Sequence, residues 1–171
     1  MEKKIIDWTE AIDETIKAFN ESRVLLVSVD KENKPNPMAI GWGTIGPIWQ
    51  KPVFIVLVRP TRYTFDLINQ SGDFTVNIAS EDLKKTVLYC GTVSGKEHDK
   101  FKEKDLTPIS SKYIQSPIIK ECIINFECKV IYKNDLIETE IPSEIVSSLY
   151  PKRDFHRVFW GQILCCYKNI L

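Results

Sequence analysis

The sequence predicts a mainly β domain, an antiparallel barrel with short peripheral helices. Apolar residues alternate with polar ones in about six short segments, the pattern of half-buried strands. A polar turn at residues 31–36 separates the first two of these strands, which predicts a hairpin. Helices occur only at intervals and no Gly-x-Gly-x-x-Gly motif follows a strand, so a doubly wound sheet is not expected. A closed antiparallel barrel fits these observations best.

The first part of the chain predicts one helix and three strands. Residues 8–21 place large apolar side chains at helical spacing, with charged side chains between them. The period then changes to two, so residues 24–30 and 37–44 read as the strands of the first hairpin. Two X-Pro pairs lead into residues 53–59, an apolar run that predicts a buried strand.

The rest of the chain alternates strands and helices less regularly. A helix that begins near Thr61 is closed by Ser71-Gly72, and the alternation over residues 122–132 is the clearest in the chain. The predicted elements are a helix at 61–70, a strand at 73–79, a helix at 81–89, a loop with one helical turn within 91–105, a strand at 122–132, a helix at 142–149 and a strand at 158–167. No repeat or linker interrupts them, so residues 1–171 are expected to form a single domain.

Length and charge limit the class of function. A chain of 171 residues with 43% hydrophobic and 27% charged residues is long enough for one core and has the composition of a globular domain. Its 23 basic and 23 acidic residues give no formal net charge. Proteins that bind polyanions carry a basic excess, so nucleic acid is not expected as the main partner.

The location is expected to be cytoplasmic. Residues 1–7 are charged and lack the apolar core of a secretion signal, and the longest apolar run, residues 53–58, is too short to cross a membrane. The five cysteines form an odd set without Cys-x-x-Cys spacing, which favours reduced structural thiols. Neither a membrane partner nor a metal site is expected.

The first stretch that suggests chemistry runs from Asn36 to Thr44. It reads Asn-Pro-Met-Ala-Ile-Gly-Trp-Gly-Thr, with Gly41 and Gly43 inside a predicted strand. Glycine weakens a strand and often marks a place where a flat ligand approaches the backbone, as a flavin ring would. The alternative is a bend in the barrel or a close strand crossing.

The second stretch is Arg59-Pro60-Thr61-Arg62-Tyr63-Thr64, at the end of a buried strand and the start of a helix. A helix N-terminus offers free N–H groups and a positive dipole end, which suit a phosphate. The arginines and threonines add charged and neutral donors. The alternative is that Thr61 caps the helix and the arginines are solvated.

Both stretches, in this order, resemble the flavin-reductase-like family of FMN-binding split barrels, and within it the flavoredoxins. Residues 73–78 are similar to the family's strand after the phosphate helix. Residues 90–101 resemble its G-x-x-S-G-x-x-x-D-K-F loop. The resemblance covers residues 20–130 well and returns at 156–163, whereas residues 134–157 are less familiar.

The resemblance implies an FMN-binding split β-barrel of the antiparallel Greek-key type, assembled as a homodimer with one FMN per subunit near the interface. Asn36 and Trp42 would contact the flavin directly, and Ser94, Gly95 and Lys100 would close the site. The residues that it implies for cofactor binding are Asn36, Pro37, Met38, Ala39, Gly41, Trp42, Gly43, Thr44, Arg59, Thr61, Arg62, Tyr63, Thr64, Ser94, Gly95 and Lys100. No catalytic side chain is expected, because the flavin carries the redox chemistry.

Several functions share such a site. The expected one is electron or hydride transfer through FMN, with NADH or NADPH as co-substrate, or with a small-molecule or protein redox partner. The alternatives are a non-enzymatic flavin-binding or sensing protein, and a split barrel that binds haem or pyridoxal phosphate. His98 and His156 are the weaker candidates for contact with cofactor or substrate.

Overall fold

The computed structural model describes residues 2–170, and its main sheet has eight antiparallel strands. These strands are β1 (Lys3–Ile5), β2 (Val24–Val29), β3 (Pro35–Ala39), β4 (Gly43–Ile48), β5 (Lys51–Val58), β6 (Asp73–Ile78), β9 (Ile124–Asp135) and β10 (Arg157–Asn169). Two shorter strands, β7 (Pro108–Ile109) and β8 (Ile118–Ile119), pair with each other. The predicted mainly β, antiparallel fold is confirmed.

The two strands at the edges of the sheet follow each other directly in the chain. Its order is β3-β2-β6-β9-β10-β5-β4, so β3 and β4 form the two edges. Residues 40–42 cross from one edge to the other, where the Ile40 amide donates to the Val24 carbonyl (3.1 Å) and the Leu57 amide to the Trp42 carbonyl (3.4 Å). The short crossing brings the two edges close together, and residues 40–42 belong to neither strand.

Strand periodicity sends alternate side chains into one apolar core. Phe54 on β5 and Phe126 on β9 are fully buried, with ring centroids 5.2 Å apart, and Phe74 on β6 lies in the same cluster. Burying a side chain of this size stabilises the fold by about 1.5–3 kcal/mol. On the opposite face of β2, Leu25 and Val27 belong to a second cluster, so β2 is buried on both faces.

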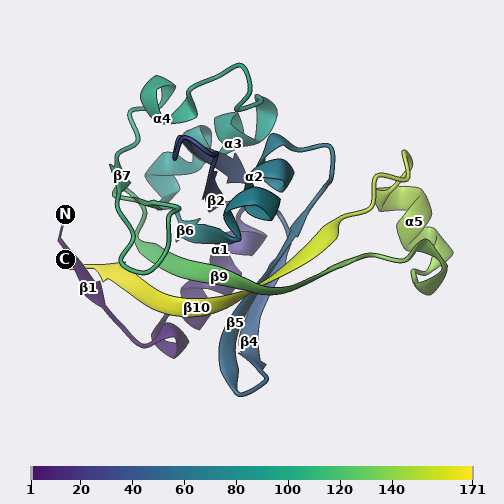
Figure 1. Ribbon diagram of the computed structural model, residues 1–171, viewed down its shortest axis with the longest axis horizontal. Coiled ribbons are helices and arrows are strands. Elements are labelled where there is room, and N and C mark those ends of the chain that lie inside the picture. Colours follow the sequence, from purple (N-terminus) through teal and green to yellow (C-terminus); the bar gives the residue numbers. More distant parts are fainter. Residues whose placement is uncertain (1, 171) are drawn as a thin grey trace.

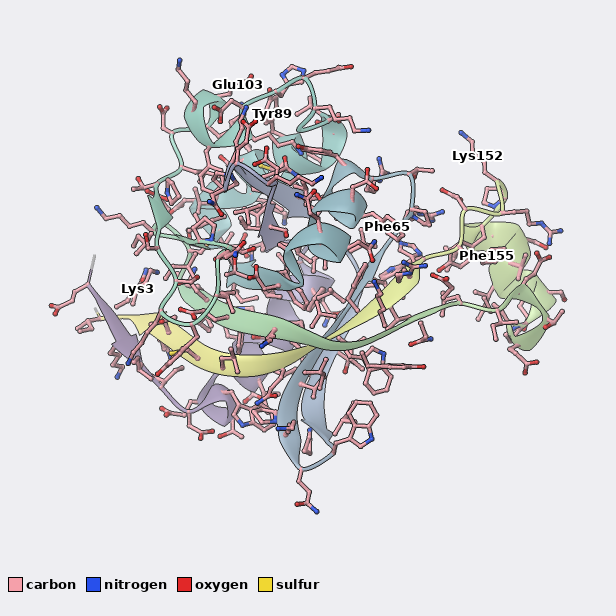
Figure 2. The ribbon with its side chains drawn as sticks, in the orientation of Figure 1. Lys3, Phe65, Tyr89, Glu103, Lys152 and Phe155 are labelled. Carbon is pink, nitrogen blue, oxygen red and sulfur yellow. The ribbon has the colours of Figure 1, made fainter. Side chains whose placement is uncertain are left out.

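The helices are short and peripheral (Figure 1). They are η1 (Trp8–Ala11), α1 (Ile12–Asn20), α2 (Tyr63–Ser71), η2 (Glu81–Leu83), α3 (Lys84–Thr92), α4 (Lys100–Glu103), η3 (Glu138–Glu140) and α5 (Ser143–Leu149). Helix α2 packs on β2, β3 and β6, and α3 and α4 pack on β3. Helix α5 instead stands away from the barrel, on an arm formed by the ends of β9 and β10 (Figure 1). Lys152 and Phe155 lie on this arm (Figure 2).

The structure corrects several of the predicted boundaries. The strand predicted at 37–44 is broken, because residues 40–42 form the crossing between β3 and β4. The helix predicted at 61–70 begins only at Tyr63. The helix predicted at 8–21 opens as a 3-10 turn, in which the Asp7 carboxylate accepts from the Thr9 amide (2.9 Å) and Glu10 bonds back to the Asp7 amide (3.1 Å).

Polar residues on β6 and β9 hold the long connection between them. Glu127 is fully buried, and its carboxylate accepts the amides of Lys112 and Tyr113 (2.8 Å each) and the Tyr167 hydroxyl (2.5 Å). Asp73 accepts the amides of Gln115 and Ser116 in the same way (3.0 and 3.2 Å). Residues 111–116 therefore cover Glu127, on the polar face of the strand predicted at 122–132.

The two ends of the described chain meet at the end of the barrel opposite the arm (Figure 1). Strand β1 pairs with the last residues of β10, where Lys3 lies opposite Asn169. The Ile170 amide donates to the Glu2 carbonyl (2.9 Å). Within residues 2–170, no helix has the length and apolar character needed to cross a membrane.

Candidate functional site

Two cavities of about 220 and 230 Å³ adjoin at strand β3, where both are lined by Met38, Ala39 and Arg62. We name the one at the start of α2 the anion pocket and the one beside the β3–β4 crossing the ring pocket. The anion pocket is lined further by residues from the start of α2 and from the 90–100 segment. The two segments singled out in the sequence thus lie side by side.

The N-terminus of α2 opens onto the anion pocket. Its N-cap is Arg62, which has extended backbone dihedrals and whose side chain makes no capping hydrogen bond, while its carbonyl accepts the Phe65 amide (3.0 Å). Without a side-chain cap, the first N–H groups of this nine-residue helix are available to a ligand. Thr61 lines the pocket but does not cap the helix, so the capping alternative raised for Thr61 is wrong.

Lys100 contributes a buried positive charge to the anion pocket. The side chain is only 3% exposed, and its Nζ donates to the carbonyls of Cys90 (2.8 Å) and Pro37 (3.1 Å). No carboxylate in residues 2–170 forms an ion pair with it. Burial, helped by the nearby Arg62, lowers the pKa of Lys100 below its ordinary value. A buried cation without a counter-ion is costly, and an anion in the pocket would offset that cost.

Asn36, Thr64 and Gly95 lock the pocket wall together. The Asn36 Nδ2 donates to the Thr64 Oγ1 (2.9 Å), and both side chains are buried. A Cβ on Gly95 would overlap the Asn36 Oδ1, so only glycine allows the 94–96 turn to lie against β3. Asn36 on β3 therefore contacts both α2 and the 94–96 turn. Tyr63 and Ser94 complete the lining of the anion pocket.

Most of the residues that line the ring pocket are apolar. Met38, Ile40 and Leu57 line it, together with Gly41, whose Cα faces open space, and Trp42, which is partly exposed. The exposed backbone at Gly41 and the apolar side chains form a surface that a planar group could cover.

Three residues predicted in the cofactor site have other surroundings. Gly43 and Thr44 line neither pocket, and a Cβ on Gly43 would lie 2.8 Å from both the Ile55 carbonyl oxygen and Phe19. The close-crossing alternative therefore explains Gly43. Pro37 contributes its carbonyl to Lys100 but lines neither pocket.

Arg59 lines the ring pocket and not the anion pocket, in contrast to the predicted phosphate role. Its guanidinium forms an ion pair with Asp154 (2.5 Å) and donates to the Leu149 carbonyl (2.9 Å). It also stacks over the Tyr150 ring at 5.0 Å. These partners lie about 90 residues along the chain, and nothing in the sequence of the 59–64 stretch indicates them.

The arm contributes one wall of the ring pocket through His156, which the sequence indicates only as a weaker candidate. His156 lines the ring pocket, with its imidazole 4.9 Å from the Trp42 ring. Burial and the charges of Arg59 and Arg62 lower its pKa to about 4, so it is neutral at pH 7. His98, in contrast, lies outside both pockets and contacts Glu103. In the described chain, no group of three or more potential metal-ligating side chains comes together.

Comparison with known proteins agrees with this geometry. The chain matches the model of the flavin reductase like domain over residues 19–165. It belongs to that family. The match includes the β3–β4 crossing, the α2 turn, the Lys100 segment and the arm, and so covers both pockets. Membership of this family supports a flavin as the ligand.

Individual relatives support the same assignment. The structure of the flavoredoxin of Desulfovibrio vulgaris (Miyazaki F) superimposes with a TM-score of 0.69 and 27% identity, over 85% of this chain and 68% of that one. A Shewanella frigidimarina protein described as a flavin reductase with a split barrel domain gives a TM-score of 0.70 at 17% identity, over 96% and 75% of the chains, which shows the shared fold.

Among curated proteins, an uncharacterized protein of Archaeoglobus fulgidus is 37% identical over 99 residues. That match covers 57% of this chain and 55% of the relative. The matches to the first three curated relatives span 45–64% of their lengths.

Proposed function

We propose that this chain binds FMN, with the phosphate in the anion pocket and the isoalloxazine in the ring pocket, and acts as an FMN-dependent oxidoreductase. Buried Lys100 carries the proposal, because it lies in the cavity without a carboxylate partner. The flavoredoxin likeness and the family match support the same ligand.

The anion pocket suits a phosphate monoester. Lys100 supplies a buried cation, Arg62 a second charge at the rim, and α2 its free N–H groups. The Thr64 hydroxyl accepts from Asn36, so its hydrogen is free to point into the pocket. These donors come from two separate segments of the chain, residues 62–64 and Lys100.

The ring pocket would orient the isoalloxazine and exclude water from one of its faces. Met38 and Ile40 supply apolar contact, and the bare backbone at Gly41 allows close approach. FMN, when bound, supplies the electron- or hydride-accepting group. The electron donor is proposed to be NADH, NADPH or a small-molecule or protein redox partner.

Absorbance of the purified protein tests the cofactor. Oxidised FMN, haem and pyridoxal phosphate have distinct spectra, so the spectrum also tests the two alternative ligands. Colourless protein that takes up no FMN at micromolar concentration would overturn the proposal. Stopped-flow mixing with NADH or NADPH then tests the reaction. Bleaching of the flavin supports a flavin reductase, bleaching only by a reduced carrier supports a flavoredoxin-like role, and no bleaching by either supports a binding or sensing protein.

We also propose a homodimer. Trp49, Tyr132 and Trp160 form a surface cluster in which Trp49 stacks on Trp160 at 5.7 Å and is 62% exposed. Exposed aromatic groups of this kind are typical of protein interfaces. Helix α5 has only seven residues and, within residues 2–170, packs closely on no other element, and a helix this short needs a packing partner.

A further inference from the structure

The arm places a tyrosine against the histidine of the ring pocket. The Tyr150 hydroxyl lies 2.8 Å from the His156 Nδ1, and the two side chains are 3% and 9% exposed. The Tyr150 ring contacts the Phe155 ring (4.8 Å between centroids) and the Arg59 guanidinium (5.0 Å). These contacts restrict the position of the hydroxyl.

The hydrogen-bond partners of Tyr150 indicate which of the two groups is the donor. In residues 2–170, the Tyr150 hydroxyl has no partner other than the His156 Nδ1. If Nδ1–H were the donor, the tyrosine hydrogen would be buried without an acceptor, at a cost of about 1–3 kcal/mol. The lower-energy arrangement has Tyr150 donating to an unprotonated Nδ1.

This arrangement decides which nitrogen of His156 carries the hydrogen. The lowered pKa of His156 keeps the ring neutral at pH 7, so it has one N–H only. With Nδ1 accepting from Tyr150, that hydrogen is on Nε2. Nε2 has no hydrogen-bond partner elsewhere in the described chain, and the ring lines the cavity beside Trp42.

We propose that Tyr150 is a positioning residue that holds His156 in its Nε2–H form, and that His156 donates this hydrogen to a carbonyl oxygen of a planar ligand stacked on the open face of a flavin in the ring pocket. The proposal rests on the FMN-dependent function for the identity of the reaction. Trp42 supplies an aromatic wall for such a ligand, and the Arg59 charge is already paired with Asp154.

The tautomer is tested first, in protein freed of FMN. Imidazole ¹⁵N chemical shifts distinguish the two neutral forms, and the chain has only two histidines, so a His98→Gln variant assigns the signals. We expect wild-type His156 in the Nε2–H form and Tyr150→Phe as a mixture of both forms. A wild-type Nδ1–H form, or an unchanged spectrum in Tyr150→Phe, would overturn the positioning role of Tyr150.

The donor role is tested in FMN-loaded protein with acetophenone and ethylbenzene, which differ by the carbonyl oxygen. We expect acetophenone binding, followed by the flavin absorbance, to weaken about tenfold in His156→Leu, the loss of one hydrogen bond. His156→Gln, which keeps an N–H at a similar reach, should retain most of the affinity.

The affinity for ethylbenzene should change less than about twofold in these variants, because it does not depend on the His156 donor. Equal losses for both probes, or no binding of acetophenone to the wild type, would overturn the carbonyl assignment. Failure to bind FMN would instead overturn the proposed function, while the tautomer result would stand by itself.

Discussion

Arg62 and Lys100 both carry charge into the anion pocket but differ in burial. Arg62 is exposed at the N-cap of α2, whereas Lys100 is buried at the start of α4. An exposed cation contributes little until a ligand meets it, whereas a buried one affects the stability of the ligand-free protein. The two residues therefore predict different measurements.

Arg62→Ala should weaken FMN binding roughly ten- to a hundredfold, since a charged hydrogen bond contributes about 1.5–3 kcal/mol. Riboflavin lacks the phosphate, so its affinity should hardly change. Fluorescence quenching with both flavins and both proteins measures the difference. Equal losses for FMN and riboflavin would show that Arg62 maintains the fold of the turn instead of binding phosphate.

Lys100 should give FMN-free protein a characteristic pH dependence. Its folded pKa is lowered, so the unfolded chain binds more protons between that pKa and 10.5, and stability should rise with pH over this window. FMN affinity should fall over the same range, because the phosphate favours the charged lysine. Lys100→Met should lose both slopes. Melting temperatures and FMN titrations of the two proteins at several alkaline pH values provide the comparison, and identical slopes would contradict the assignment.

The sequence could predict residues whose role depends on neighbours in the chain. The glycine at 41, the helix start near Arg62 and the Ser94-Gly95 turn are local patterns, and the structure brings all of them to the two pockets. Arg59 could not be assigned in this way, because its partner Asp154 comes from the arm. Side-chain pairing across such a separation leaves no periodic signal.

At the scale of elements, strands were predicted where alternation lasted five residues or more. The break at residues 40–42 was missed because the apolar and small residues there continue the alternation, although they belong to neither strand. Strands β1, β7 and β8 have two or three residues, too few to show a period. Their pairing depends on tertiary contacts.

The connection held by Glu127 gives a prediction about stability. Its two carboxylate oxygens accept two amides and a hydroxyl, whereas the amide of glutamine offers one acceptor oxygen and would set an NH₂ group against a donor. Glu127→Gln should therefore destabilise the protein by about 1–3 kcal/mol in urea unfolding.

Glu121→Gln is the matched control. The Glu121 carboxylate accepts a single amide, that of Thr107 (3.0 Å), and a glutamine oxygen can replace it. A change in unfolding free energy within about 0.5 kcal/mol is expected. If both variants lose the same stability, the buried carboxylate has no special role in holding residues 111–116.

At the scale of the whole molecule, the barrel and the arm differ in how they are stabilised. The barrel has a continuous core, whereas α5 has a buried side only around Val146 and exposes Ile145 and Leu149. The proposed dimer would cover such surfaces. It would also bring a second chain near the cluster of Trp49, Tyr132 and Trp160.

Trp49→Asp should shift the protein toward a monomer of 19.8 kDa, because a charge would be buried in the proposed interface. Gln50→Asp, at the next position of the same hairpin turn, is the control and should remain a dimer. Sedimentation velocity at several concentrations gives the masses. A wild-type chain that sediments as a monomer with full flavin occupancy would reject the dimer.

The pairing of β1 with β10 brings the two ends of the described chain next to each other. Because the Glu2 and Ile170 backbones share a hydrogen bond, a short glycine-rich linker could join the two ends without stretching either strand. New ends could then be opened in the exposed turn between β2 and β3, at Glu32, whose side chain is free of the core. We expect such a permuted chain to keep both pockets and to bind FMN as the parent does. A flavin titration of the permuted protein would show how far the order of the segments can change while the site remains.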